Sequence, residues 1–289
     1  MSKTRVLITG GSGDLGTVVS SLLLKDGFSV TSLDPLEPTT QGIDSIQGSI
    51  LDRTLLDVLV ANFDIVIHIA AWHGFHAFTK TKTDAEFWDL NMTGTFNLLN
   101  ACEKAGVKKL LFISSSSVEE WPDIYGTTKL LGEELCRSYS IRASMQILAL
   151  RPRAFIPWWN MSVYKNITEW AAWFTRGAIH IDDVAQSCLL GCHFLRAKSD
   201  SFFEALILDG KRDLSDEDLA DWKNKGGKAV LANHFPHYRE LIMNCSFIPT
   251  EPPTYRDNSQ ATELLGFRPR YGLGEMLEDV AMHDSRRAA

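Results

Sequence analysis

Tyr125 and Lys129 stand four positions apart, in the order Y-x-x-x-K, at the start of a stretch with helical spacing. Side chains with this separation share one face of a helix, one turn apart. A free tyrosine has a pKa of about 10 and is a poor base near neutral pH, but a nearby ammonium group favours its phenolate form. The pair therefore has the chemistry of an acid and base that removes a hydroxyl proton while a hydride leaves the same carbon.

A glycine-rich turn lies near the beginning of the chain. It follows a short apolar segment at 5–9, has the spacing G-x-x-G-x-x-G, and leads into an amphipathic stretch at 14–25. Glycine permits a tight turn and a close approach of the backbone to a pyrophosphate, and the free N–H groups at the start of a helix favour an anion. The order of strand, turn and helix predicts a dinucleotide-binding site. The residues expected to border the cofactor here are Gly10, Gly13, Asp14, Leu15 and Gly16.

Asp34 follows the second apolar segment, at 28–33. A carboxylate at the end of this strand can bind a ribose 2′-hydroxyl, and it would repel the additional phosphate of NADP. The next residues, Pro35 and Leu36, offer no positive charge to counter that repulsion. The sequence therefore predicts NAD as the cofactor. The alternative is that Asp34 only caps a turn with Pro35.

Together these features resemble the short-chain dehydrogenase/reductase superfamily, and in particular its extended branch, the NAD-dependent sugar epimerase/dehydratase family. The likeness is strongest from residue 5 to residue 152. Besides the glycine turn and the tyrosine–lysine pair, it rests on the serines at 114–117, on His68-Ile-Ala-Ala, Asn91-Met-Thr-Gly-Thr and Arg151-Pro152, and on segments at 180–184 and 261–269.

The resemblance implies a function for each residue of the catalytic set. Tyr125 is the acid/base, and Lys129 tunes it and binds the nicotinamide ribose. Ser115 hydrogen-bonds the reacting oxygen, because the family's catalytic hydroxyl precedes by three residues a valine that matches Val118; Ser116 is the alternative. Further cofactor contacts are expected at Ala70 and Asn91, and at Asp52 or Ile50 near the adenine.

The chain also departs from the family pattern. The Val-Tyr-Gly that commonly follows the serines is Val118-Glu119-Glu120 here, and Ser115 precedes Tyr125 by only ten positions. This spacing is short for the branch, and the shortened loop removes part of the usual substrate wall.

The segment between Arg151 and Asp182 is also short for a family that wraps nucleotide-linked sugars. We therefore expect a smaller substrate, such as a free sugar or sugar acid, in a dehydrogenase similar to uronate dehydrogenases. One alternative is an epimerase or dehydratase with tightly held NAD, for which Glu119 and Glu120 are the nearby carboxylates. A non-catalytic NAD-binding regulator ranks last because both Tyr125 and Lys129 are present. Candidate substrate contacts are His73, His76, Ser115, Ser116, Arg153, Arg176, Trp158 and Trp159.

The elements that must position these residues follow from the hydrophobic pattern. Apolar segments alternate with helical ones through the first 150 residues, which predicts an α/β fold: a Rossmann doubly wound parallel sheet covered by helices on both faces. Residues 1–152 are expected to form the NAD-binding core, and 153–289 a small substrate-binding region interleaved with a last core helix and strand at about 178–208. The expected strands are 5–9, 28–33, 44–47, 65–69, 110–113, 145–150 and 203–208, and the main helices 14–25, 54–61, 85–105, 125–140, 166–174, 180–195, 259–265 and 273–282.

Composition narrows the class of protein. The 289 residues are 45% hydrophobic and 22% charged, with a net charge of −7, which is typical of a globular enzyme and disfavours nucleic acid as a partner. We see no membrane-spanning stretch and no secretory signal, so we expect a cytoplasmic protein. Cys188, Cys192 and His193 could hold a metal, but their apolar surroundings favour buried thiols, and we predict no metal site. The resemblance implies a homodimer paired through 85–105 and 125–140.

Overall fold

The computed structural model describes residues 3–119 and 123–288, and the chain forms two compact units. The first unit contains Met1–Pro152, Val184–Ile207 and Ser259–Phe267. The second contains Arg153–Asp183, Leu208–Asn258 and Arg268–Ala289. Each is described by itself below. No helix in the described part of the chain is long and apolar enough to cross a bilayer.

A seven-stranded sheet forms the centre of the first unit, in the order β3-β2-β1-β4-β5-β6-β7, and the pairs from β3 to β6 are parallel. Val6, Leu7 and Ile8 of β1 are fully buried. A strand that is buried on both faces has apolar residues at consecutive positions, and this run in the sequence predicted a parallel sheet with both faces covered. The predicted Rossmann fold is thus confirmed. The strands are β1 (Arg5–Thr9), β2 (Ser29–Asp34), β3 (Asp44–Gln47), β4 (Ile65–His68), β5 (Lys109–Ile113), β6 (Gln146–Pro152) and β7 (Phe202–Leu208).

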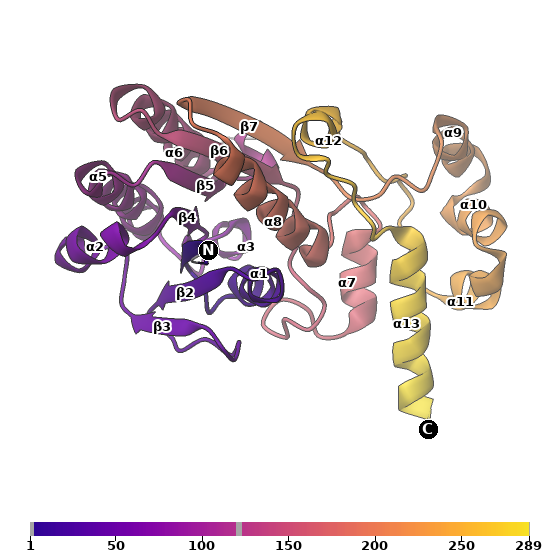
Figure 1. Ribbon diagram of the computed structural model, residues 1–289. Helices are drawn as coiled ribbons and strands as arrows, with labels where there is room; N and C mark the ends of the chain where they lie inside the picture. Colours follow the sequence, from indigo (N-terminus) through magenta and orange to yellow (C-terminus); the bar gives the residue numbers. More distant parts are fainter. Residues whose placement is uncertain (1–2, 120–122, 289) are drawn as a thin grey trace. The chain divides into compact units, whose positions relative to one another are not determined.

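Helices cover both faces of this sheet (Figure 1). Buried residues of α2, α5 and α6 form one core with the strands, while α1 and α8 lie on the opposite face. The helices of the first unit are α1 (Asp14–Lys25), α2 (Arg53–Leu59), the short α3 (Gly74–Phe78) and α4 (Asp84–Phe87), α5 (Gly94–Ala105), α6 (Ile124–Arg142), α8 (Ile181–Ala197) and α12 (Ser259–Leu265). A π-helical segment, Trp88–Thr93, joins α4 to α5, and 3-10 turns occur at Val60–Asn62 and Ser116–Val118.

The strand order reverses at β1, which has β2 on one side and β4 on the other. In open α/β sheets ligands bind outside the carboxyl ends of the strands at such a switch point. The residues that end these strands or follow them directly, Gly10, Asp34 and Ile69, therefore border the place where a dinucleotide is expected.

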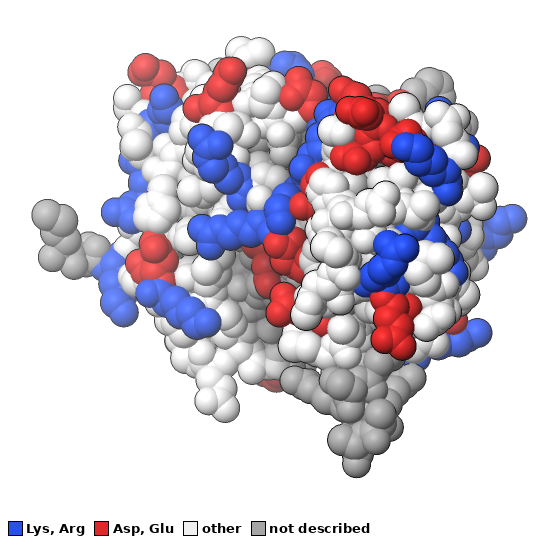
Figure 2. Space-filling model, turned by 90° about the vertical axis from the view of Figure 1, so that its right-hand side faces the viewer, with Lys and Arg blue, Asp and Glu red and all other residues white. Residues whose placement is uncertain are grey.

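The second unit is mainly helical, around a core that includes Trp170, Trp222, Ile242 and Leu277. Its helices are α7 (Ile167–Phe174), α9 (Asp216–Lys225), α10 (Gly227–His234), α11 (Arg239–Asn244) and α13 (Leu273–Ala288), with a 3-10 turn at Pro236–Tyr238. On the face that Figure 2 shows, basic and acidic side chains lie next to one another.

Candidate active site

The glycine turn between β1 and α1 is packed tightly against other backbone at Gly10 and Gly16 and less tightly at Gly13. Gly10 has φ +75°, and a Cβ there would lie 2.7 Å from the backbone nitrogen of Ala70. A Cβ at Gly16 would lie 2.2 Å from the carbonyl oxygen of Gly10. A Cβ at Gly13 would lie 3.5 Å from the Gly10 carbonyl oxygen, an ordinary van der Waals contact, so this position is not crowded by the protein itself. Two glycines shape the turn, and the third leaves room for a pyrophosphate against the backbone.

The Asp34 carboxylate ties the end of β2 to this turn. It accepts the N–H of Leu36 at 2.9 Å, which is the turn cap weighed as an alternative above. It also accepts the N–H of Ser12, in the glycine turn, at 3.2 Å. A carboxylate has about four lone-pair sites, so both bonds leave acceptor capacity for ribose hydroxyls.

Tyr125 lies in the first turn of α6, where the Asp123 side chain caps the helix through the N–H of Gly126. Ser115, beyond the end of β5, lies beside Tyr125, and its side chain favours the phenolate form of the tyrosine. The Lys129 ammonium lies 5.9 Å from the centre of the Tyr125 ring and donates to the carbonyl oxygen of Ile113 at 2.7 Å. The structure thus brings together the three residues of the predicted catalytic set.

Burial shifts the pKa of both titrating groups. It raises the pKa of Tyr125 above its ordinary value of 10, although the side chain of Ser115 acts in the opposite direction. Burial also lowers the pKa of Lys129 to about 8, a shift that the nearby Glu133 carboxylate partly offsets. The expectation that Lys129 lowers the pKa of Tyr125 is therefore not met by the protein's own groups, because desolvation of the phenolate and the nearby Asp123 carboxylate raise this pKa and the opposing effect comes from Ser115.

Glu133 is a buried residue beneath this site that the sequence analysis missed. It accepts hydrogen bonds from Arg151 Nε at 2.9 Å and Nη2 at 2.6 Å, and from Ser114 Oγ at 2.5 Å. It therefore fastens α6 to the ends of β5 and β6. Its position one helical turn after Lys129 was the available signal.

Asn91 holds two parts of the site in place. Its Oδ1 accepts the N–H of Trp72 at 2.8 Å, and its Nδ2 donates to the Trp72 carbonyl and to Thr128 Oγ1, both at 3.1 Å. The amide is 3% exposed and its hydrogen bonds all lie within the chain. The structure gives Asn91 a positioning role, between the loop after β4 and the catalytic helix.

The other expected cofactor neighbours also have local partners. Asp52 caps α2 by accepting the N–H of Leu55 at 3.0 Å, and its side chain is exposed. Ala70 donates its N–H to the Thr9 carbonyl at 3.0 Å and packs against Gly10. Contact of these residues with NAD stays a prediction.

His73 and His76 follow β4 close to the catalytic pair. A Cβ at Gly74 would lie 3.1 Å from Cδ1 of Tyr125, so this loop packs on the tyrosine ring. The two imidazoles are 4.3 Å apart, and His73 Nδ1 is enclosed without a hydrogen-bond partner among the described residues. Burial lowers the pKa of His73 to about 4, with His76 and Lys129 adding to the shift. His73 is therefore neutral at neutral pH.

The predicted contacts in the second unit are mostly engaged there. Arg153 donates through Nη1 to the carbonyl oxygen of Thr254 and through Nη2 to its hydroxyl at 2.9 Å, and Nη1 lies 3.6 Å from the buried Asp209. These bonds occupy the guanidinium and do not favour Arg153 as the partner of a substrate carboxylate. Trp158 and Trp159 lie edge to face, and Trp159 is 43% exposed.

The carboxylates and thiols weighed from the sequence lie elsewhere. Glu119 is 3.6 Å from the Arg151 guanidinium, and Glu120 lies outside the described residues. Cys188 and Cys192 are fully buried, and burial raises the pKa of both thiols. His193 faces Asp26, at 2.8 Å. Among the described residues no group of three or more potential ligands could hold a metal ion.

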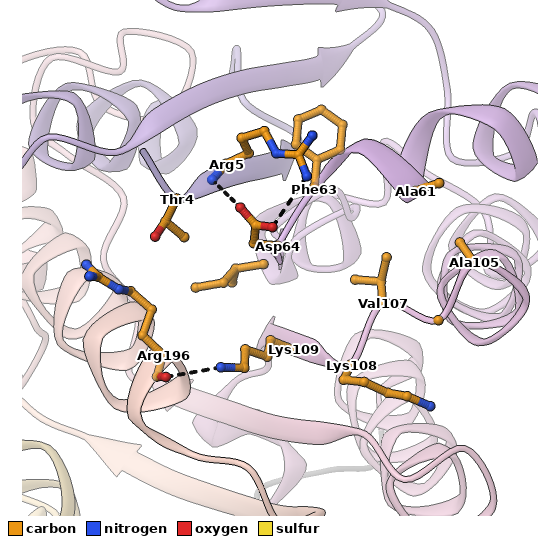
Figure 3. A pocket seen from close by; sticks show the side chains of 12 residues that line it. Thr4, Arg5, Ala61, Phe63, Asp64, Ala105, Val107, Lys108, Lys109 and Arg196 are labelled. Atoms are coloured by element: carbon orange, nitrogen blue, oxygen red, sulfur yellow. Dashed lines mark hydrogen bonds and ion pairs between the residues drawn. The ribbon is translucent and has the colours of Figure 1, made fainter. Parts of the chain in front are cut away.

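A cavity of about 550 Å³ lies at the opposite edge of the sheet, at the amino ends of β1, β4 and β5 (Figure 3). Asp64 pairs there with Arg5 across 3.4 Å, and Lys109 donates to the Arg196 carbonyl at the end of α8. Lys108 similarly donates to Ala143, which ends α6. These lysines satisfy helix carboxyl termini, and the cavity is remote from the carboxyl ends of the strands where the candidate site lies.

Comparison with known proteins decides the family. The model of the NAD dependent epimerase/dehydratase family matches residues 6–190. The chain belongs to this family. It is therefore an enzyme of the short-chain dehydrogenase/reductase type, and the family's dependence on NAD agrees with the cofactor that Asp34 predicted.

Individual proteins of the epimerase/dehydratase family match shorter parts of this chain. UDP-N-acetyl-alpha-D-glucosaminuronate decarboxylase of Bacillus cytotoxicus is 34% identical over 167 residues, 48% of this chain and 51% of that protein. UDP-glucose 4-epimerase of Bacillus subtilis is 32% identical over 161 residues, 46% and 47% of the two chains. The match thus spans about half the length of these curated relatives. The solved structure of MoeE5 with UDP-glucuronic acid and NAD has a TM-score of 0.71 at 24% identity and covers 99% of this chain and 100% of its own, which shows the shared fold.

Proposed function

We propose that this epimerase/dehydratase-family enzyme oxidises a hydroxyl of a nucleotide-linked sugar and recovers the hydride within the same turnover. The observation that carries the proposal is the grouping of Ser115, Tyr125 and Lys129 at one place, in a chain whose relatives carry the names of nucleotide-sugar enzymes. The expectation of a smaller substrate rested on the short segment before Asp182. The second unit also includes Leu208–Asn258 and Arg268–Ala289. The short segment before Asp182 therefore does not by itself limit the size of the substrate.

Each residue of the candidate site has a proposed role in cofactor binding or proton transfer. The turn at residues 10–16 would hold the pyrophosphate, and Asp34 the adenosine ribose. Tyr125 would take the proton from the substrate hydroxyl, Ser115 would hold the same oxygen, and Lys129 would bind the nicotinamide ribose. NAD, when bound, accepts the hydride and adds a positive charge near the phenol. That charge would oppose the rise in the Tyr125 pKa that burial causes.

His73 is the first candidate for contact with the sugar. Its ring is neutral and has an enclosed Nδ1 without a partner among the described residues, and the next residue, Gly74, packs on the Tyr125 ring. It can offer one N–H to a sugar oxygen without placing a charge in the site.

A dehydrogenase that releases NADH from a free sugar acid is the other candidate function. The ten-position spacing between Ser115 and Tyr125 favours it, because a shortened loop leaves less wall around a large substrate.

We also propose a homodimer paired through α5 and α6, where Phe96 is 41% and Leu131 36% exposed. Light scattering that gives the mass of one chain would exclude that pairing.

Two substrate panels separate the proposals: UDP-hexoses and UDP-uronic acids in one, free sugars and uronic acids in the other. Products are followed by NMR and NADH by absorbance. The proposed function predicts a changed sugar without stoichiometric NADH in the first panel. Stoichiometric NADH with a free sugar acid, and no product from UDP-sugars, would instead establish the dehydrogenase.

A further inference from the structure

One hydrogen-bonded chain of buried side chains runs through the first unit from the glycine turn to the catalytic helix. Thr9 Oγ1 lies 2.7 Å from His68 Nδ1, and His68 Nε2 lies 2.9 Å from Thr95 Oγ1. These three residues are at most 2% exposed. Thr95 Oγ1 donates to the Asn91 carbonyl at 2.5 Å, and the Asn91 side chain donates to Thr128 Oγ1 at 3.1 Å.

The position of every proton in this chain follows from its partners. A carbonyl oxygen only accepts, so the single Thr95 hydroxyl proton goes to Asn91, and Thr95 Oγ1 must accept from His68 Nε2–H. His68 is then neutral, and its bare Nδ1 accepts the Thr9 hydroxyl proton. Burial lowers the pKa of His68 to about 3, with Lys129 adding to the shift, so the ring keeps this one tautomer near neutral pH. Both ring nitrogens are satisfied in a single arrangement.

The two ends of the chain lie at the two halves of the expected NAD site. Thr9 directly precedes Gly10, and its hydroxyl also accepts the N–H of Ala70 at 3.4 Å. At the other end lies Thr128, which directly precedes Lys129. Its hydroxyl donates to the Tyr125 carbonyl at 3.0 Å. The chain therefore joins the turn that would hold the pyrophosphate to the helix that would meet the nicotinamide ribose.

We propose that His68 is a positioning residue which, through Thr9 and Thr95, holds these two halves in register for NAD. The inference rests on NAD binding at residues 10–16. Loss of the Thr95 hydroxyl leaves the His68 N–H without its acceptor and lets α6 shift relative to the glycine turn. A ligand that spans both halves then binds less well, while ADP, which reaches only the turn and Asp34, does not.

The test measures binding of NAD and of ADP by calorimetry in the full-length protein and in Thr95→Val. NAD should bind about tenfold more weakly while ADP affinity changes less than about twofold, and Thr95→Ser should restore NAD binding. The matched control is Thr175→Val. Thr175 is also fully buried and donates to the carbonyl four residues earlier, that of Ala171, at 2.6 Å, but it has no histidine partner.

Equal changes for NAD and ADP, or no change in either, would overturn the inference. If Thr95→Val does not fold, Thr9→Val with Thr9→Ser makes the same comparison at the other end of the chain, with the same expected outcome. If the unmodified protein bound neither nucleotide, the NAD site itself would be refuted together with the inference. Normal binding of both, with Thr95→Val behaving like Thr175→Val, would refute only the positioning role.

Discussion

The side chain of Ser115 lies beside Tyr125 and favours its phenolate form, although the two residues belong to different elements. Ser115 caps the short turn after β5, where its Oγ accepts the N–H of Ser117 at 3.1 Å, and Tyr125 begins α6. Two hydroxyls in contact can share one substrate oxygen, with the tyrosine moving the proton and the serine holding the oxygen in place. This contact distinguishes Ser115 from Ser116, which the sequence left as an alternative.

Ser115→Ala should lower turnover about 100-fold, because it removes one of the two hydroxyls placed at the reacting oxygen. NAD affinity should change less than about twofold, since the serine is not needed for the pyrophosphate or ribose contacts. Ser116→Ala is the matched control and should retain turnover within a few-fold. Steady-state kinetics with calorimetry measures both effects, and equal losses in the two variants would contradict the assignment.

The glycine turn predicts opposite effects at two nearby positions. Gly13 has φ −75°, and a Cβ there would make only an ordinary van der Waals contact, 3.5 Å from the Gly10 carbonyl oxygen, so Gly13→Ala should keep its melting temperature and lose at least tenfold in NAD affinity. Gly16→Ala would place a methyl group 2.2 Å from the Gly10 carbonyl and should destabilise the fold by about 2 kcal/mol. Thermal unfolding and NAD titration measure the two effects. Undiminished NAD binding by Gly13→Ala would exclude the turn as the pyrophosphate site.

Asp34→Asn should reduce the preference for NAD over NADP about tenfold, because it removes the negative charge that repels the 2′-phosphate. Asp44→Asn is a suitable control, since Asp44 is an exposed carboxylate on the neighbouring strand β3. Titration with both dinucleotides gives the ratio. An unchanged ratio in Asp34→Asn would show that this carboxylate does not select NAD over NADP and only stabilises the turn through Ser12 and Leu36.

The strands and main helices could be predicted because their patterns are local. Three consecutive buried residues in β1 leave an apolar run that is visible in the sequence. Helix α9 was missed because it is charged on most sides and buries only Trp222. Its one local signal was the capping box formed by Ser215 and Asp218.

The catalytic set was predictable from its motif, whereas the residues that position it were not. His68, Thr95 and Glu133 act through partners that are distant in sequence and meet only when the strand order is known. The resemblance predicts that Asn91 contacts the cofactor, and this stays a prediction; the hydrogen bonds of its amide to Trp72 and Thr128 form only in the folded chain. The roles of these residues depend on tertiary contacts that spacing does not specify.

His73 should make the fold less stable in acid. Its folded-state pKa of about 4 lies below the ordinary 6.5, because burial, His76 and Lys129 all disfavour the charged ring. Below pH 6.5 the unfolded chain binds a proton that the folded protein does not, so stability falls as the pH drops towards 4, by at most about 1.4 kcal/mol per pH unit. His73→Gln should show a smaller fall in denaturant midpoint from pH 7 to 5 than the unmodified protein.

His76→Gln is the control for this pH dependence. Its pKa is also lowered by burial and by Lys82, but the ring is less enclosed and Nδ1 lies 3.1 Å from Thr81 Oγ1. Its variant should therefore keep most of the acid sensitivity. Identical pH profiles for His73→Gln and the unmodified protein would show that the fold does not lower the pKa of His73, and would count against its neutral role beside the sugar.

The most direct test of the account is Tyr125→Phe, assayed on the best UDP-sugar for turnover and titrated with NAD. If Tyr125 is the acid/base, the variant should lose at least about 1000-fold in turnover, because the hydroxyl that remains at the reacting oxygen, that of Ser115, holds the oxygen and does not transfer its proton. It should still bind NAD within a few-fold, since the turn, Asp34 and Lys129 remain. Turnover within tenfold of the unmodified enzyme would contradict the central claim that this tyrosine transfers the proton.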